Sequence, residues 1–173
     1  MSGSQPNLER ILAAPAFPDD TGDADPGVMA ALAAHDGDPT SYPLALRALQ
    51  ASRLLAPVVA LLGEVEYDEH GLAHDKTSDM AAVLLTGRDG RLALLTFTSL
   101  ETMRRWNPEA RPVPVATQLA AQSALQNDAA ALLVDVAGPH SFVIEGDDLQ
   151  AVARGWTLAG VGGRAAWIRP AGE

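Results

Sequence analysis

The stretch MAAVLLTGRDGRLALLTF, residues 80–97, decides the fold class of this chain. It consists of two apolar runs on either side of GRDGR, where Asp89-Gly90 supplies residue types that reach positive φ in a tight turn. Apolar runs joined by such a turn are typical of a β-hairpin. We therefore predict an antiparallel pair of strands near the middle of the chain.

The second strand of this hairpin runs directly into TSLETMRRW, residues 98–106. Thr98 and Glu101 are three residues apart, which is the spacing of a capping box: the hydroxyl accepts from a backbone N–H and the carboxylate reaches back to the cap. The pattern predicts a short helix that begins near Ser99 and ends by Asn107-Pro108.

ARPVPV, residues 110–115, comes next and has proline at alternate positions. Pro112 and Pro114 carry no backbone N–H, so this segment can pair along one side only. We expect an edge strand or an extended connector.

The remaining patterns place helices and hairpins in alternation. The order indicates an α+β domain with a mixed, largely antiparallel sheet and helices packed on it, rather than a strictly parallel fold. Residues 1–26 are rich in Asp and Pro and are expected to form a flexible acidic arm, with one domain over 27–173. The predicted elements are two helices after Pro26 and after Thr40 or Ser41, a buried strand over 58–65, a helix opened by Thr117, strands in 130–136 and 142–146, a helix capped by Asp147 and closed by Gly155, and a hairpin in 156–170.

Composition narrows the classes of function. The chain has 173 residues, a net charge of −10 and no cysteine. An acidic surface repels phosphate backbones, which disfavours nucleic acid. No signal peptide and no run long enough to span a membrane is evident. We expect a cytoplasmic protein that does not bind membranes and has no thiolate chemistry.

DEHGLAHDKTSD, residues 68–79, is the densest run of acids and histidines. Imidazoles and carboxylates suit Zn²⁺ or Mn²⁺. However, His70 and His74 would align as ligands only on a helix, and Gly71 argues against one. The interpretation favoured is a solvated loop between strands, without a metal or other cofactor.

Three residues outside that loop are candidate binding residues: Trp106, Arg111 and Asp135. Asp135 interrupts an apolar strand and must reach the edge of the sheet or find a partner, for which Arg111 is a candidate. Trp106 ends a helix beside the proline-marked strand, and Trp and Arg are enriched at binding hot spots. The competing interpretation of Trp106 is a plug between helix and sheet.

The segments DKTSDMA, GRDGRLALLTFTS, RPVPV and VDVAGP together resemble the SseB family, named for enhanced serine sensitivity, and in particular its actinobacterial members. The resemblance covers about residues 26–156. It implies a small α+β module with no established catalytic residues or cofactor. Matching positions include Lys76 and Ser78 in the first segment and Trp106, Arg111 and Asp135 in later ones.

Two hypotheses for function follow. The first is a non-catalytic interaction or regulatory module that binds another protein, or a second copy of itself as a homodimer, at the Trp106–Arg111 region. The second is a small-molecule sensor, for an amino acid, in which Lys76, Ser78, Arg111 and Asp135 converge in one cleft. Neither hypothesis makes the chain an enzyme.

Overall fold

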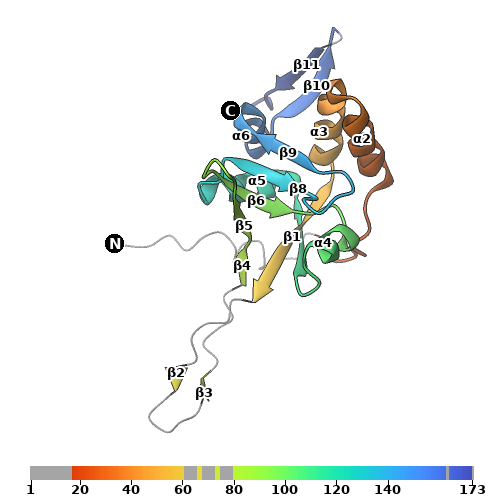
Figure 1. The fold of residues 1–173 in the computed structure, drawn as a ribbon. Coiled ribbons are helices and arrows are strands. Elements are labelled where there is room, and N and C mark those ends of the chain that lie inside the picture. The colour runs from red at the N-terminus through yellow and green to blue at the C-terminus, as the bar shows by residue number, and fades with distance from the viewer. Residues whose placement is uncertain (1–16, 61–65, 68–72, 75–79, 163, 173) are drawn as a thin grey trace.

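The computed structural model describes residues 17–60, 66–67, 73–74, 80–162 and 164–172 (Figure 1). The central hairpin is confirmed: β5 (Leu84–Thr86) and β6 (Leu92–Thr96) pair antiparallel. The N–H of Gly87 donates to the carbonyl of Arg91 at 2.8 Å, and Gly90 has φ 80°. This left-handed conformation is one that glycine adopts without steric cost.

A four-stranded sheet is built outward from this hairpin in the order β5-β6-β8-β9. β8 (Ala131–Val134) is parallel to β6, and β9 (Phe142–Glu145) is antiparallel to β8, as expected for 142–146. A parallel pair requires a long crossover. Residues 97–130, which include α4, β7 and α5, supply it.

A second sheet has the order β4-β1-β7, with β4 (Met80–Ala82), β1 (Arg53–Ala60) and β7 (Arg111–Ala116). The sheets meet where Leu55 and Phe97 exchange backbone hydrogen bonds of 2.7 and 2.9 Å. The α+β class, with mixed and largely antiparallel pairing, is confirmed, and β7 is an edge strand of its sheet as predicted.

The strand expected at 58–65 begins earlier, at Arg53, and residues 61–65 lie outside the described ranges. Pro57 does not end this strand because it lies opposite Pro112. Neither proline has an N–H. The two form a non-hydrogen-bonded pair of the antiparallel ladder, in which neither residue has to donate to the other strand.

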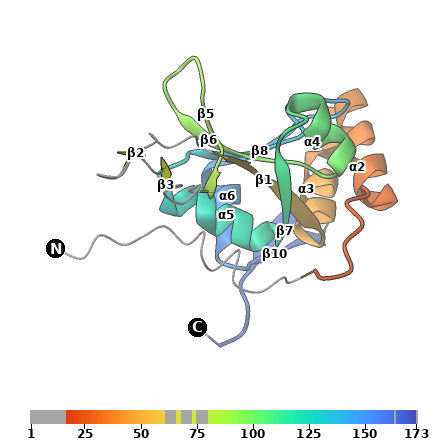
Figure 2. The ribbon, with the colours of Figure 1, turned by 90° about the horizontal axis from the view of Figure 1, so that it is seen from below.

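Helices α2 (Pro26–Gly37), α3 (Tyr42–Gln50), α5 (Thr117–Gln126) and α6 (Gly146–Ala153), with the short 3₁₀ helix η1 (Pro39–Ser41), cover one face of the sheets (Figures 1 and 2). α4 (Leu100–Trp106) covers part of the other face. Each face therefore has its own apolar cluster. The larger contains Leu32, Leu46, Leu49, Leu54, Leu132, Phe142, Ile144 and Leu149, and the smaller contains Leu55, Leu95, Phe97, Met103 and Ala110.

The caps of three helices differ from the sequence prediction. α4 begins near Ser99 as expected, but its capping box is formed by Ser99 and Thr102, not by Thr98 and Glu101. Thr98 is turned inward instead, where its hydroxyl is bound by Asp135. A buried acceptor therefore takes the hydroxyl that was expected to cap the helix.

Thr117 and Asp147 lie inside the first turns of α5 and α6 and do not cap them. The hydroxyl of Thr117 donates to the carbonyl of Leu49 at 2.7 Å, which ties α5 to the end of α3. Gly155 follows α6 with φ 73°, as expected for a residue that closes a helix.

Residues 17–25, part of the predicted acidic arm, lie against the domain. Asp25 caps α2 by accepting from the N–H groups of Gly27 and Val28 at 2.7 and 3.1 Å. The N–H of Leu100 donates to the carbonyl of Gly22 at 2.8 Å. Residues 17–25 thus make specific contacts with the domain, and residues 1–16, the rest of the predicted arm, lie outside the described ranges.

The C-terminal hairpin is confirmed as β10 (Thr157–Val161) and β11 (Arg164–Ile168), which form a two-stranded sheet. A further short ladder joins β2 (Glu66–Tyr67) to β3 (Ala73–His74). Most of the acidic run at 68–79, including His70, lies outside the described residues, so the choice between metal site and loop stays a prediction.

Candidate functional site

Asp135 follows β8 and is fully buried, with φ 51°. One carboxylate oxygen accepts from the N–H of Thr98 at 2.9 Å and the hydroxyl of Thr102 at 2.6 Å. The other accepts from the hydroxyl of Thr98 at 2.6 Å. The carboxylate thus joins the end of β8 to the start of α4.

These contacts identify Asp135 as a structural brace. Burial raises the pKa of its carboxyl group, and the hydrogen bonds from Thr102 and Thr98 oppose that rise. Arg111, the partner that the sequence suggested, is exposed at the start of β7. Two threonines therefore satisfy the acid. For Thr102, the second of these threonines, the signal in the sequence is its S-x-x-T spacing from Ser99 at the start of a helix.

Trp106 is half-buried at the end of α4, and its ring packs on Phe97 with centroids 5.7 Å apart. This contact belongs to the smaller apolar cluster. Trp106 thus has the packing role that was weighed against a binding role, with part of its surface still open.

The free edge of β7 is poorly suited to strand addition. Pro112 opposes Pro57, so in this antiparallel ladder Arg111 and Val113 direct their N–H groups toward β1. Pro112 and Pro114 therefore face outward, and neither has an N–H to donate. The register of β7 therefore leaves its outer edge without the donors at these two positions that another strand would need.

Lys76 and Ser78 lie outside the described residues. Of the four groups expected to converge in a ligand cleft, only Arg111 and Asp135 can be compared. No hydrogen bond or ion pair joins these two residues: Arg111 is exposed at a strand start, and the buried carboxylate of Asp135 accepts from Thr98 and Thr102.

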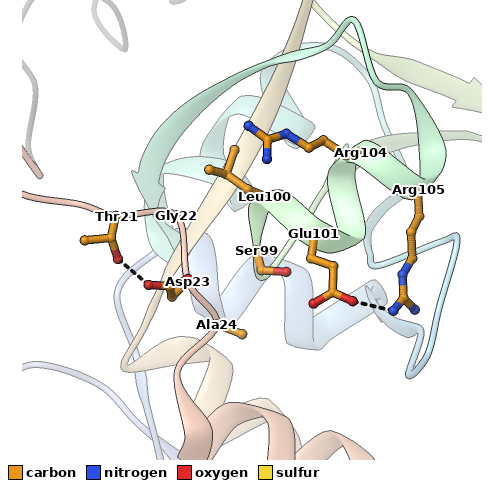
Figure 3. A pocket seen from close by; sticks show the side chains of 9 residues that line it. All are labelled: Thr21, Gly22, Asp23, Ala24, Ser99, Leu100, Glu101, Arg104 and Arg105. Atoms are coloured by element: carbon orange, nitrogen blue, oxygen red, sulfur yellow. Dashed lines mark hydrogen bonds and ion pairs between the residues drawn. The ribbon is translucent and has the colours of Figure 1, made fainter.

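The structure does form an open groove between residues 21–24 and α4, with a volume of about 660 Å³ (Figure 3). Arg104, Arg105 and Glu101 line it from α4, and Asp23 lines it from the opposite side. Glu101 and Arg105 form an i,i+4 ion pair, and the hydroxyl of Thr21 donates to Asp23 at 2.8 Å. Arg104 is exposed and makes no ion pair with any described residue.

Arg53 holds the wall of this groove in place. Its guanidinium binds the carboxylate of Asp20 and donates to the backbone carbonyls of Asp23 and Thr98. The hydrogen bond from Arg53 lowers the pKa of Asp20, more than partial burial raises it. No local pattern in the sequence predicts this interaction, because Asp20 and Arg53 are 33 residues apart and Asp20 lies in a segment with the composition of a tail.

A second, apolar hollow of about 500 Å³ lies on the four-stranded sheet, on the face opposite the larger cluster. Leu85, Ala93, Leu133 and Val143 line it, and Val143 is 41% exposed. On its rim, Arg91 pairs with Asp89 at 2.6 Å and with Glu145 at 3.1 Å.

Within the described ranges, no three side chains among His, Asp and Glu are grouped closely enough to hold a metal ion. None of the described helices has the length and apolar character required to cross a bilayer.

The fold and the groove define a small α+β domain whose described surface carries an open groove lined by two arginines and two acids. A family model, the SseB protein N-terminal domain, matches residues 28–151. The match covers well over half of the chain, and the chain belongs to the SseB family, as the sequence motifs suggested. No curated protein and no solved structure matches it.

Proposed function

We propose that this SseB-family chain is a non-catalytic interaction or regulatory module that binds an acidic segment of another protein along α4. The observation that supports this proposal is the position of Arg104 at the rim of an open groove. Its side chain is exposed and has no ion-pair partner among the described residues. A free guanidinium next to a hollow is suited to bidentate recognition of a carboxylate.

Neighbouring residues extend this cationic surface. Arg105 follows Arg104 on α4, and Arg111 is exposed at the start of β7, five residues after Trp106. The whole chain has a net charge of −10, whereas residues 104–111 hold three arginines and one acid, Glu109. Arg105 is paired with Glu101, so Arg104 and Arg111 supply the local excess of positive charge. Local complementarity of this kind sets the choice of partner and the rate of association.

Charge reversal tests the proposal more cleanly than removal of Trp106, because Trp106→Ala would also remove its packing on Phe97. The test variant is Arg104→Glu with Arg111→Glu, at two exposed positions. The matched control is Arg47→Glu, at an exposed position of α3. Partners are captured by cross-linking in the producing cells, purified, and titrated by calorimetry at low and high salt.

The expected result is a purified partner that binds the wild type and the Arg47→Glu variant equally. It should bind the double variant at least about tenfold more weakly, because two exposed positive charges that attract an acidic segment become negative. High salt should reduce this difference. Equal affinity for all three proteins would remove the α4 surface as a binding site.

The groove also supports the second hypothesis, a sensor for a small zwitterion such as an amino acid. Its volume lies within the usual range for ligand pockets. It presents Arg104 for a carboxylate and Asp23 and Glu101 for an ammonium group. Thermal unfolding in the presence of each amino acid is the test: a ligand at 100 times its Kd should add roughly 2.7 kcal/mol. The gain should vanish in Arg104→Ala, and no gain with any amino acid would reject this function.

A further inference from the structure

β11 is the outermost strand of the C-terminal hairpin (Figure 1). The N–H of Leu158 donates to the side-chain oxygen of Gln50 at 3.2 Å, so it does not pair across the hairpin. Leu158 lies opposite Trp167. Because hydrogen-bonded and non-hydrogen-bonded pairs alternate in an antiparallel ladder, the N–H and C=O of Trp167 point away from β10.

The same alternation applies to Ala165, which lies opposite Gly160. The outer edge of β11 therefore presents two backbone donors and two acceptors, from Ala165 and Trp167. No described residue forms a backbone or side-chain hydrogen bond with these four groups.

The interior of this edge lacks the features that normally prevent pairing with another strand. Charged side chains, proline and bulges are the usual protective devices, and here Arg164 and Arg169-Pro170 lie only at the two ends of the strand. The strand reads Ala-Ala-Trp-Ile after Arg164, and Ile168 is 50% exposed. The hairpin packs on the larger cluster through Leu158 and Trp167, while β11 has a partner strand on one side only.

We propose that β11 pairs antiparallel with β11 of a second copy of this chain. The two hairpins would then form one four-stranded sheet across a two-fold axis at Ala166. In this register Ala165 of one copy lies opposite Trp167 of the other, and the two pairs make four backbone hydrogen bonds. The contact is isologous and closes as a dimer without further growth.

The side chains of the strand suit pairing with itself. Ala166 meets Ala166 of the second copy on the axis, and small Ala165 lies beside large Trp167. Arg164 lies opposite Ile168, whose exposed surface its aliphatic stem can cover. No two like charges are directly opposite, an arrangement that would oppose pairing.

β11 is also held in a fixed orientation before it pairs. The indole N–H of Trp167 donates to the carboxylate of Asp148 on α6 at 2.9 Å, and Gln50 holds β10. Little ordering would remain to be done on association. The hairpin follows residue 151, the last that the family model matches, and the proposal does not depend on the α4 groove.

Two edge variants and one control test the pairing. Ala165→Pro removes an outward N–H at an exposed position, where proline is tolerated on a free edge. Ala166→Glu places two carboxylates face to face on the axis. Leu44→Glu is the control: Leu44 is an exposed apolar residue of α3, 62% exposed and outside the edge. Circular dichroism checks that each variant is folded.

Analytical ultracentrifugation over a wide concentration range measures the dissociation constant of the full chain. We expect a dimer for the wild type and for Leu44→Glu. The dissociation constant of Ala165→Pro should rise about thirtyfold, because two symmetric hydrogen bonds are lost. Ala166→Glu should be monomeric.

Hydrogen exchange supplies a second readout that does not depend on the variants. In the wild type, the amides of Ala165 and Trp167 should become protected as concentration rises, while that of Ala116 at the edge of β7 should not. A wild type that stays monomeric, or a dimer that survives both edge variants, would overturn the proposal.

Discussion

β7 and β11 are both edge strands, but their edges differ in chemistry. On β7, Pro112 and Pro114 occupy outward positions and remove the donors that another strand would need. On β11, Ala165 and Trp167 keep theirs. The free edge of β7 is thus closed to a further strand, while that of β11 is open to one. The residue types at the outward-facing positions of each strand make this difference.

The two regions also differ in how they are braced. The β7 side lies next to α4, whose start is fixed by buried Asp135 through three hydrogen bonds. β11 is tied to the domain by Trp167 and Asp148 at a part-buried position. A buried carboxylate with several donors should contribute much more to stability than a partly exposed one with a single donor.

The largest expected effect comes from Asp135→Ala. It leaves the N–H and hydroxyl of Thr98 buried without their carboxylate acceptor and leaves the hydroxyl of Thr102 with only the carbonyl of Ser99, so the free energy of unfolding should fall by about 3 kcal/mol. Asp128→Ala is the control, because Asp128 has a similar φ of 56° but is exposed. Urea denaturation measures both. Equal losses would show that the backbone conformation, and not the hydrogen bonds, carries the effect.

Restoring backbone N–H donors on the free edge of β7 should allow β7 to pair with another chain, as proposed for β11. Pro112→Val with Pro114→Val restores two outward donors, and each new interchain bond contributes about 1 kcal/mol. We expect association at concentrations where the wild type does not form that species, measured by light scattering. Pro39→Val with Pro108→Val, at two exposed positions, is the control for the loss of proline itself. Unchanged association would show that the prolines do not protect this edge.

A smaller effect is expected when the brace of β11 is removed. Asp148→Ala eliminates the acceptor of the Trp167 indole, and stability should fall by about 1 kcal/mol. The loss should be confined to the hairpin and appear as faster hydrogen exchange in residues 157–168. The neighbouring exposed Asp147 is the control, and Asp147→Ala should leave this exchange unchanged.

The smallest effect is a difference in pH dependence between two acids near Thr98. The folded-state pKa of Asp20 is lowered, so its contribution to stability is present above the usual value of 3.8 and is lost as pH falls through the lowered pKa. The pKa of Asp135 is raised because burial penalises its charged form, so the part of its stabilisation that protonation supplies is present below 3.8 and is lost as pH rises through the raised pKa.

Unfolding titrations of Asp20→Asn and Asp135→Asn against the wild type measure this difference. As pH rises from below 3.8, the Asp20 variant should become relatively less stable and the Asp135 variant relatively more stable. Parallel curves would contradict these opposite assignments.

The sequence predicted most elements because their signals are local. Asp89-Gly90 between apolar runs, proline at alternate positions and Gly155 after an amphipathic stripe each act within a few residues, and each predicted element is present. The errors occurred where a side chain has a distant partner. Thr98 was assigned to a helix cap, and the structure gives its hydroxyl to Asp135, 37 residues away.

The groove could not be predicted from the sequence. Trp106 and Arg111, which the sequence singles out as binding residues, do not line it, and its wall depends on Asp20, Asp23 and Arg53. The sequence of an acidic, proline-rich segment looks the same whether its carboxylates are solvated or paired. Only the tertiary contact with Arg53 of β1, 30 residues after Asp23, distinguishes a paired segment from a solvated one.

By itself the sequence determined the family, the α+β class and the chemistry of each strand edge, because turn propensity, alternation and missing N–H groups are properties of neighbouring residues. The tertiary structure decided which polar groups are satisfied. Burial makes an unpaired carboxylate costly, so the fold sets Asp135 against two threonines and Asp20 against Arg53, and it leaves Arg104 and the backbone of β11 turned outward. Arg104 and the outer backbone groups of β11 are therefore the groups that both binding proposals use.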